Sequence, residues 1–172
     1  RRKAGFGNGT ASSENPGRDV LEALSVNNAL ISELASGINR PQAQWTPAWK
    51  TREMPELLFE TALPHYNSVQ GVTQYLAVCA TAAARAGNTA SAHEALQIIG
   101  KLNEANLNDP FIIGLLVAAT GSLNMINATW EVCDAQCGSA ADFTNWESVL
   151  SSTDYQRATL QAWRTELAAA LN

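Results

Sequence analysis

The sequence predicts an all-α protein, an antiparallel array or bundle of about five to seven helices. Three observations support this. Apolar residues recur every three or four positions along most of the chain, alanine accounts for 29 of the 172 residues, and no stretch shows the strict apolar alternation of a strand. A hydrophobic content of 46% is sufficient for one core and too high for intrinsic disorder.

The N-terminal residues differ from the rest in charge and composition. Three basic residues at positions 1–3 against Glu14 give residues 1–17 a net charge of +2, so the total of −5 leaves −7 for the remainder. Glycines and small polar residues follow the basic start, without the apolar stretch of a signal peptide. We predict a flexible tether over residues 1–17 and a single all-helical domain over residues 18–172. Two interpretations of the tether stay open, the flank of a membrane anchor and an ordinary frayed terminus.

The charge pattern also limits the classes of partner that we expect. An acidic body lacks the basic surface that phosphate backbones require, so we expect no nucleic acid. Residues 110–130 carry no formal charge and are long enough to cross a bilayer, but Thr120, Ser122 and Asn124 favour a buried helix. We therefore expect no membrane insertion of the folded domain. The basic tether slightly favours an extracytoplasmic, membrane-tethered location over a cytoplasmic one.

A first helix is predicted over residues 16–36. Asn15 is the expected N-cap, Pro16 suits the first helical position, and Gly37 ends the helix. An apolar stripe runs along it, interrupted by two asparagines, and comprises Val20, Leu21, Leu24, Ile31, Leu34 and Ala35.

Residues 39–64 break the helical rhythm with four prolines and form a long strap. Within it, Trp45, Trp49 and Arg52 are our candidate binding residues, because tryptophan and arginine often dominate interfaces. The alternative is that the tryptophans fill gaps between helices as packing anchors, and we favour this structural interpretation.

A helical hairpin is predicted over residues 64–105. The first helix carries a narrow apolar seam of Val69, Val72, Leu76, Cys79, Ala83 and Ala86. Gly87 and Asn88 form the turn, and Ser91 with Glu94 matches a capping box for the second helix.

The rest of the chain predicts three more helices. Asp109 is the expected cap of an uncharged helix that begins at Pro110, with an inward stripe at spacings of 4, 3, 4 and 3, namely Gly114, Ala118, Gly121, Met125 and Ala128. A short helix capped by Ser139 or Thr144 follows. The last helix, capped by Thr153 or Asp154, carries an apolar face of Leu160, Trp163, Leu167 and Leu171.

Two resemblances follow from these residues. The stretch Leu76 to Ala83, with Gly87-Asn88, Ala92, Leu96 and Ile99, resembles one degenerate tetratricopeptide repeat, although Ala83 stands where an aromatic residue is usual. The order Arg40-Pro41, Leu63-Pro64-His65, the hairpin and Asp109-Pro110 is similar to that of uncharacterised helical proteins of planctomycetes and verrucomicrobia. Many of those look membrane-tethered at the N-terminus, and the resemblance implies no catalytic residue.

No constellation of residues predicts a specific chemistry. Glu56 and Glu60 near His65 would suit acid–base work or ligand binding, but acidic residues at a helix start are the commoner explanation. Cys133 and Cys137, or one of them with Cys79, would form a disulfide in an oxidising compartment, and two ordinary thiols are the alternative. We predict no metal site, no cofactor and no catalytic residue.

The sequence therefore favours a non-enzymatic helical module that binds a protein partner. Our candidate binding residues are Trp45, Trp49, Arg52, Glu56 and His65. The alternative is an all-α small-ligand-binding protein or enzyme with a pocket under the 39–64 strap.

Overall fold

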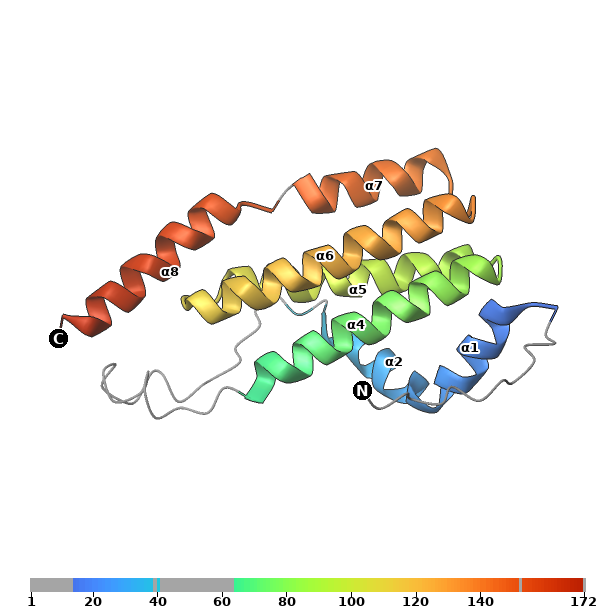
Figure 1. The fold of residues 1–172 in the computed structure, drawn as a ribbon, viewed down its shortest axis with the longest axis horizontal. Coiled ribbons are helices and arrows are strands. Elements are labelled where there is room, and N and C mark those ends of the chain that lie inside the picture. Colours follow the sequence, from blue (N-terminus) through green and yellow to red (C-terminus); the bar gives the residue numbers. More distant parts are fainter. Residues whose placement is uncertain (1–13, 39, 41–63, 152, 172) are drawn as a thin grey trace, which may run out of the picture.

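A computed structural model describes residues 14–38, 40, 64–151 and 153–171. Helices joined by short turns make up this part of the chain, and none of its residues lies in a strand. The predicted all-α array of packed helices is confirmed (Figure 1).

Three long helices form the centre of the fold. Helices α4 (Pro64–Arg85), α5 (Thr89–Leu107) and α6 (Ile112–Asp134) run up, down and up, and each packs against the other two. Their shared core consists of aliphatic and small side chains, including Leu76, Ala80, Ala83, Leu96, Ile98, Ile99 and Met125. Residues from all three helices contribute to it, so the hairpin and α6 share one core.

The first predicted helix is divided in two. Helix α1 (Pro16–Leu24) packs on α4, a 3-10 turn occupies Ser25–Asn27, and α2 (Asn28–Gly37) contacts α5. The break lies at the polar interruption of the stripe, where the Ser25 hydroxyl donates to the Glu22 carbonyl at 2.7 Å. Short polar side chains that bond to nearby backbone compete with a regular helix, which accounts for the break.

The cap of α5 and the start of α6 differ from the prediction. Asn88 caps α5, its side-chain oxygen accepting from the Ser91 backbone N–H at 3.1 Å, so the expected capping box does not form. Helix α6 begins at Ile112 rather than Pro110, because Asp109 accepts from the Phe111 N–H at 3.3 Å and so directs the chain into the helix.

The turn between α4 and α5 requires a special backbone. Gly87 has φ of 76°, and the N–H of Asn88 donates to the Ala83 carbonyl while that of Gly87 donates to Ala84. These two bonds form a Schellman motif, which favours glycine at the left-handed position. The predicted hairpin turn is therefore observed at Gly87 and Asn88.

Helix α7 (Ala140–Ser151) is held on α5 by a buried tryptophan. Trp146 is almost fully enclosed, and its indole N–H donates to His93 Nδ1 at 3.0 Å. His93 is half-buried on α5 and accepts this bond. Ser139 caps α7 and Asp154 caps α8 (Tyr155–Ala170), as the sequence indicated.

Helices α5 and α6 approach each other closely at the predicted small-residue stripe. All five residues of the stripe are buried. A Cβ added at Gly121 would collide with the side-chain amide of Asn103, and one at Gly114 would lie 2.8 Å from Asp109 Cβ. An alanine at Gly121 would require the Asn103 side chain to move, and one at Gly114 would require a shift of Asp109 in the turn before α6.

We expect Gly121→Ala to destabilise the protein by roughly 1–3 kcal/mol, because the buried Asn103 amide has to move. Gly71→Ala is a matched control: Gly71 lies exposed on α4 with nothing near its Cβ position, so alanine should stabilise α4 by roughly 0.5–1 kcal/mol. Urea unfolding followed by circular dichroism measures both. Equal effects of the two substitutions would contradict the close approach of α5 and α6.

Candidate interaction surface

The structure describes one of the five candidate binding residues. Trp45, Trp49, Arg52 and Glu56 lie outside the described residues. His65 lies in the first turn of α4, and its grouping with the glutamates and tryptophans stays a prediction.

His65 belongs to a buried polar cluster at one end of the bundle. Its Nε2 lies 3.9 Å from Asp109 Oδ2, and the two side chains are 13% and 2% exposed. The Tyr66 hydroxyl donates to the same carboxylate oxygen at 2.8 Å. The cluster therefore ties the start of α4 to the turn before α6.

Burial dominates the electrostatics of this cluster. It raises the pKa of Asp109 above its ordinary value, although the Tyr66 hydroxyl, the Phe111 N–H and His65 all act in the opposite direction. Burial and the neighbouring Asp109 carboxylate also raise the pKa of Tyr66. Asp109 accepts from the Tyr66 hydroxyl with one carboxylate oxygen and from the Phe111 N–H with the other.

The two cysteines of the C-x3-C pair lie in different surroundings. Cys137 is buried, with its Sγ 3.1 Å from Thr89 Oγ1, whereas Cys133 is exposed on the last turn of α6. Both are free thiols in the structure, as is Cys79. The disulfide stays a prediction for oxidising conditions.

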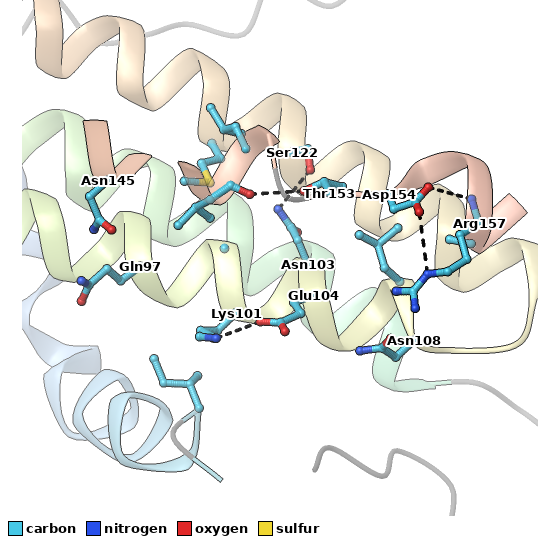
Figure 2. Close-up of a pocket in the computed structure, with 17 residues that line it drawn as sticks. Gln97, Lys101, Asn103, Glu104, Asn108, Ser122, Asn145, Thr153, Asp154 and Arg157 are labelled. Carbon is cyan, nitrogen blue, oxygen red and sulfur yellow. Dashed lines mark hydrogen bonds and ion pairs between the residues drawn. The ribbon is translucent and has the colours of Figure 1, made fainter. Parts of the chain in front are cut away.

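A cavity of about 540 Å³ lies where α7 meets α8, over α5. Figure 2 shows Asn103, Ser122 and Asn145 together with two ion pairs at its wall. Lys101 Nζ lies 2.8 Å from Glu104 Oε2, and Arg157 Nε lies 3.9 Å from Asp154 Oδ2. Each of these four charged side chains is thus paired with a residue of its own helix or of that helix's N-cap.

The inner wall of the cavity is a hydrogen-bonded polar group. The Tyr155 hydroxyl donates to Ser122 Oγ at 2.6 Å, and the Asn103 amide donates to the same oxygen at 3.3 Å. Tyr155 and Ser122 join α8 to α6 in this way. The cavity wall brings together amides and paired charges, with no histidine or cysteine among the residues that line it.

Helix α6 presents a second, outward apolar seam. Leu116, Ala119, Leu123, Ile126 and Trp130 recur at spacings of 3, 4, 3 and 4 on the side opposite the buried stripe. The four large side chains of this outer seam are exposed, and Trp130 is 73% exposed. The expectation of a buried helix is therefore wrong for this side of α6.

The apolar face that the sequence predicts for the last helix is also exposed. Helix α8 packs beside the first half of α6, where Glu166 accepts from the Ile112 N–H at 2.9 Å. It does so with small residues, Ala158 and Ala162, while the stripe on its other side is in solvent, namely Leu160, Trp163, Leu167 and Leu171. Helix α8 packs on α6 with its small residues rather than its large apolar ones, because small residues permit closer helix contact.

A groove of about 520 Å³ lies beside the outer seam of α6. It lies between α1, α4 and α6, and its apolar lining includes Val20, Val78 and Trp130. Arg85 closes one end, with its guanidinium 2.7 Å from Glu131 and 2.6 Å from Asp134. We call the outer seam of α6 and this groove the outer face; the α8 stripe lies on the side of α8 away from its buried alanines.

By length and composition, α6 is the one helix in the described part of the chain that could span a membrane. A third of its most hydrophobic window is buried inside the protein. The core of a water-soluble protein and a membrane span both produce such a helix, so this property does not decide between them.

No family model, curated protein or solved structure matches this chain. The geometry of the outer face and of the cavity therefore carries the functional argument. Sequence reasoning missed the outer face, although a signal existed: the 3, 4, 3, 4 spacing from Leu116 to Trp130 is visible in the sequence beside the inward stripe.

The raised pKa of Asp109 predicts a pH dependence of stability. Because the folded state holds this proton more tightly than the unfolded chain, its contribution is greatest at low pH and is lost as the pH rises through the raised pKa. Asp109→Asn lacks this titration, so its stability relative to wild type should rise between about pH 4 and neutrality. Urea unfolding at a series of pH values measures the difference.

Asp109→Ala is the matched comparison for that experiment. It leaves the buried Tyr66 hydroxyl and the Phe111 N–H without their acceptor, so it should cost roughly 1–3 kcal/mol. A constant difference between Asp109→Asn and wild type across the pH range would contradict the proposed origin of the shift.

Proposed function

We propose that this protein is a non-enzymatic helical interaction module whose outer face binds an amphipathic helix of a protein partner. The observation that carries the proposal is the outer seam of α6, where Leu116, Leu123, Ile126 and Trp130 stand exposed in line. Contiguous apolar surface of this kind marks interaction sites in soluble proteins.

The spacing of the outer seam favours a helix as the occupant. Apolar residues at 3 and 4 positions in alternation form the ridge that interlocks with another helix at a shallow angle. A tryptophan at one end supplies the large anchor that dominates many interfaces. The groove beside Trp130 gives room for a side chain of the incoming helix.

The charges along the outer seam of α6 favour a protein over a lipid surface. Residues 110–130 carry no charge, and Arg85, which lines the groove beside the seam, is paired with two carboxylates. Helices that lie in a membrane surface usually carry lysine or arginine along their polar edge. The acidic body further opposes approach to anionic lipid.

Three hypotheses accompany this proposal. A membrane tether over residues 1–17 and an extracytoplasmic location would bring the module close to a bilayer without inserting it. The likeness of α4 and α5 to a tetratricopeptide hairpin is consistent with a binding role. A pocket under the 39–64 strap stays the alternative, and it would involve residues that the structure does not describe.

Site-specific photo-crosslinking in source cells tests the proposal. A benzophenone side chain in place of Leu123 should give a covalent adduct with a protein, and the attachment point should lie on an apolar helix face. The control replaces Glu94, which is exposed on α5, and should give little adduct. Ile126→Ser with Trp130→Ser should reduce the Leu123 adduct about tenfold, corresponding to roughly 1.4 kcal/mol of binding.

Both serine substitutions fall on exposed positions, so the double variant should keep its helical content by circular dichroism. Lipid adducts alone at position 123 would contradict the proposal. The same protein adducts in equal amount from position 94 would contradict it as well.

A further inference from the structure

We infer that His93 is a pH-dependent switch for α7: protonation of its ring breaks the hydrogen bond with Trp146 and loosens α7 from α5. The Trp146 indole N–H donates to His93 Nδ1 across 3.0 Å, and this bond joins the two helices. A ring nitrogen accepts a hydrogen bond only while it carries no proton. The inference is independent of the proposed function, because neither residue belongs to the outer face.

Helix α7 has one fully buried anchor. Trp146 is the one buried residue of this helix and is 1% exposed. The other apolar side chains that α7 packs on the core, those of Phe143, Val149 and Leu150, are only partly buried. A helix with so little buried surface is among the first parts of a fold to open locally. The position of α7 is therefore sensitive to the surroundings of Trp146.

The hydrogen bonds of His93 define its neutral form. Because Nδ1 accepts from the Trp146 indole, the neutral ring carries its proton on Nε2. The terminal amide group of Gln97 lies 2.7 Å from Nε2, so its oxygen has to face the ring and accept from it. Both ring nitrogens are thus engaged while the ring is uncharged, and a second proton has to displace the indole.

A protonated His93 has a different partner on the same helix. With a hydrogen on Nδ1, the ring and the indole of Trp146 present two donors to each other. Asp142 lies one turn before Trp146, with Oδ1 3.8 Å from Nδ1, and can accept from the charged ring. The hydrogen bonds from Ser139, followed by the charge of His93, lower the pKa of Asp142, so this carboxylate is ionised when His93 is protonated. Protonation thus transfers the bond from Trp146 to Asp142.

This exchange of partners weakens the attachment of α7. The His93 and Asp142 side chains are 25% and 28% exposed, and ion pairs open to solvent contribute little to stability. The indole of Trp146 is enclosed, and a buried donor without an acceptor costs more than such a pair contributes. Helix α7 is therefore held most firmly when the ring is neutral, and it loosens as the pH falls through the range of about 5 to 8 in which histidines change charge.

The other charged groups do not explain a loosening at low pH. In the described part of the chain, every hydrogen bond and ion pair of His93 is to Gln97, Trp146 or Asp142. Glu94 follows it on α5 and is exposed, and Cys137, in the turn before α7, contacts Thr89. The raised pKa of Asp109 has the opposite effect, because its contribution to stability is greatest at low pH.

Loosening of α7 opens the cavity over α5. Asn145, Val149 and Leu150 form the part of its wall that α7 supplies. Val149 also packs directly on Gly100 of α5, with its Cγ1 2.7 Å from the position that a Cβ there would occupy. The charge of His93 thus controls how far the floor of the cavity is exposed.

Hydrogen–deuterium exchange of the full chain, read by mass spectrometry near neutral pH and at about pH 5.5, tests the inference. After correction for the intrinsic effect of pH on exchange, the α7 amides of the wild type should exchange roughly tenfold faster at the lower pH, and those of α4 and α6 should not. His93→Gln gives Trp146 an acceptor that does not titrate, so its α7 should exchange equally at both pH values. No change in wild-type α7, or the same change in His93→Gln, would overturn the inference.

Trp146→Phe keeps the test decisive if glutamine does not fit. It removes the donor that protonation of His93 displaces, so α7 should be looser than in the wild type at both pH values, with no further loosening at low pH. His65→Gln is the matched control, because His65 is the other histidine of the chain and lies on α4. This variant should keep the pH effect on α7. Persistence of the effect in Trp146→Phe, or its loss in His65→Gln, would overturn the role of His93.

Discussion

The close approach of α5 and α6 is the constraint on which the rest of the structure depends. At Gly121 the α6 backbone lies against the Asn103 side chain of α5, and at Gly114 it lies against Asp109 and the Asn106 carbonyl, so an added Cβ would require a neighbouring group to shift. Two glycines inside one helix cost about 1 kcal/mol each relative to alanine, so close packing offsets this cost. Because the inner stripe is made of small residues, the largest apolar side chains of α6 fall on its other side.

The same constraint shapes the C-terminal helices. Ser122 lies beside the glycine stripe and receives hydrogen bonds from both Asn103 and Tyr155, so the α5–α6 contact also positions the start of α8. Helix α8 then follows α6 with Ala158 and Ala162 inward. The two alanines face α6 because the hydrogen bonds of Tyr155 and Glu166 to α6 require the two helices to lie close together. Its leucines and Trp163 are left outside as a consequence.

Most of the fold could be predicted from local signals, and the site could not. The glycine turn at Gly87 and the inward stripe of α6 depend on residues close in sequence, and both were predicted; for α8 the sequence left Thr153 and Asp154 open as caps, and Asp154 is the one observed. Which side of α8 meets the core depends on packing between distant segments, and its apolar period alone does not give it. Trp45, Trp49, Arg52 and Glu56 stay predictions.

Several polar residues of α6 bond within the fold and lie off its outer seam. Asn124 donates to Thr73 on α4 at 3.3 Å, Thr120 donates to the Leu116 carbonyl at 3.0 Å, and Ser122 bonds on the inner side. Asn127 is exposed and lines the groove beside Trp130. If the outer seam were always exposed to water, leucine would have no advantage over glutamine at its positions, since exposed positions favour polar residues. The outer seam is therefore better explained by a surface that is covered when the protein acts than by the stability of the single chain.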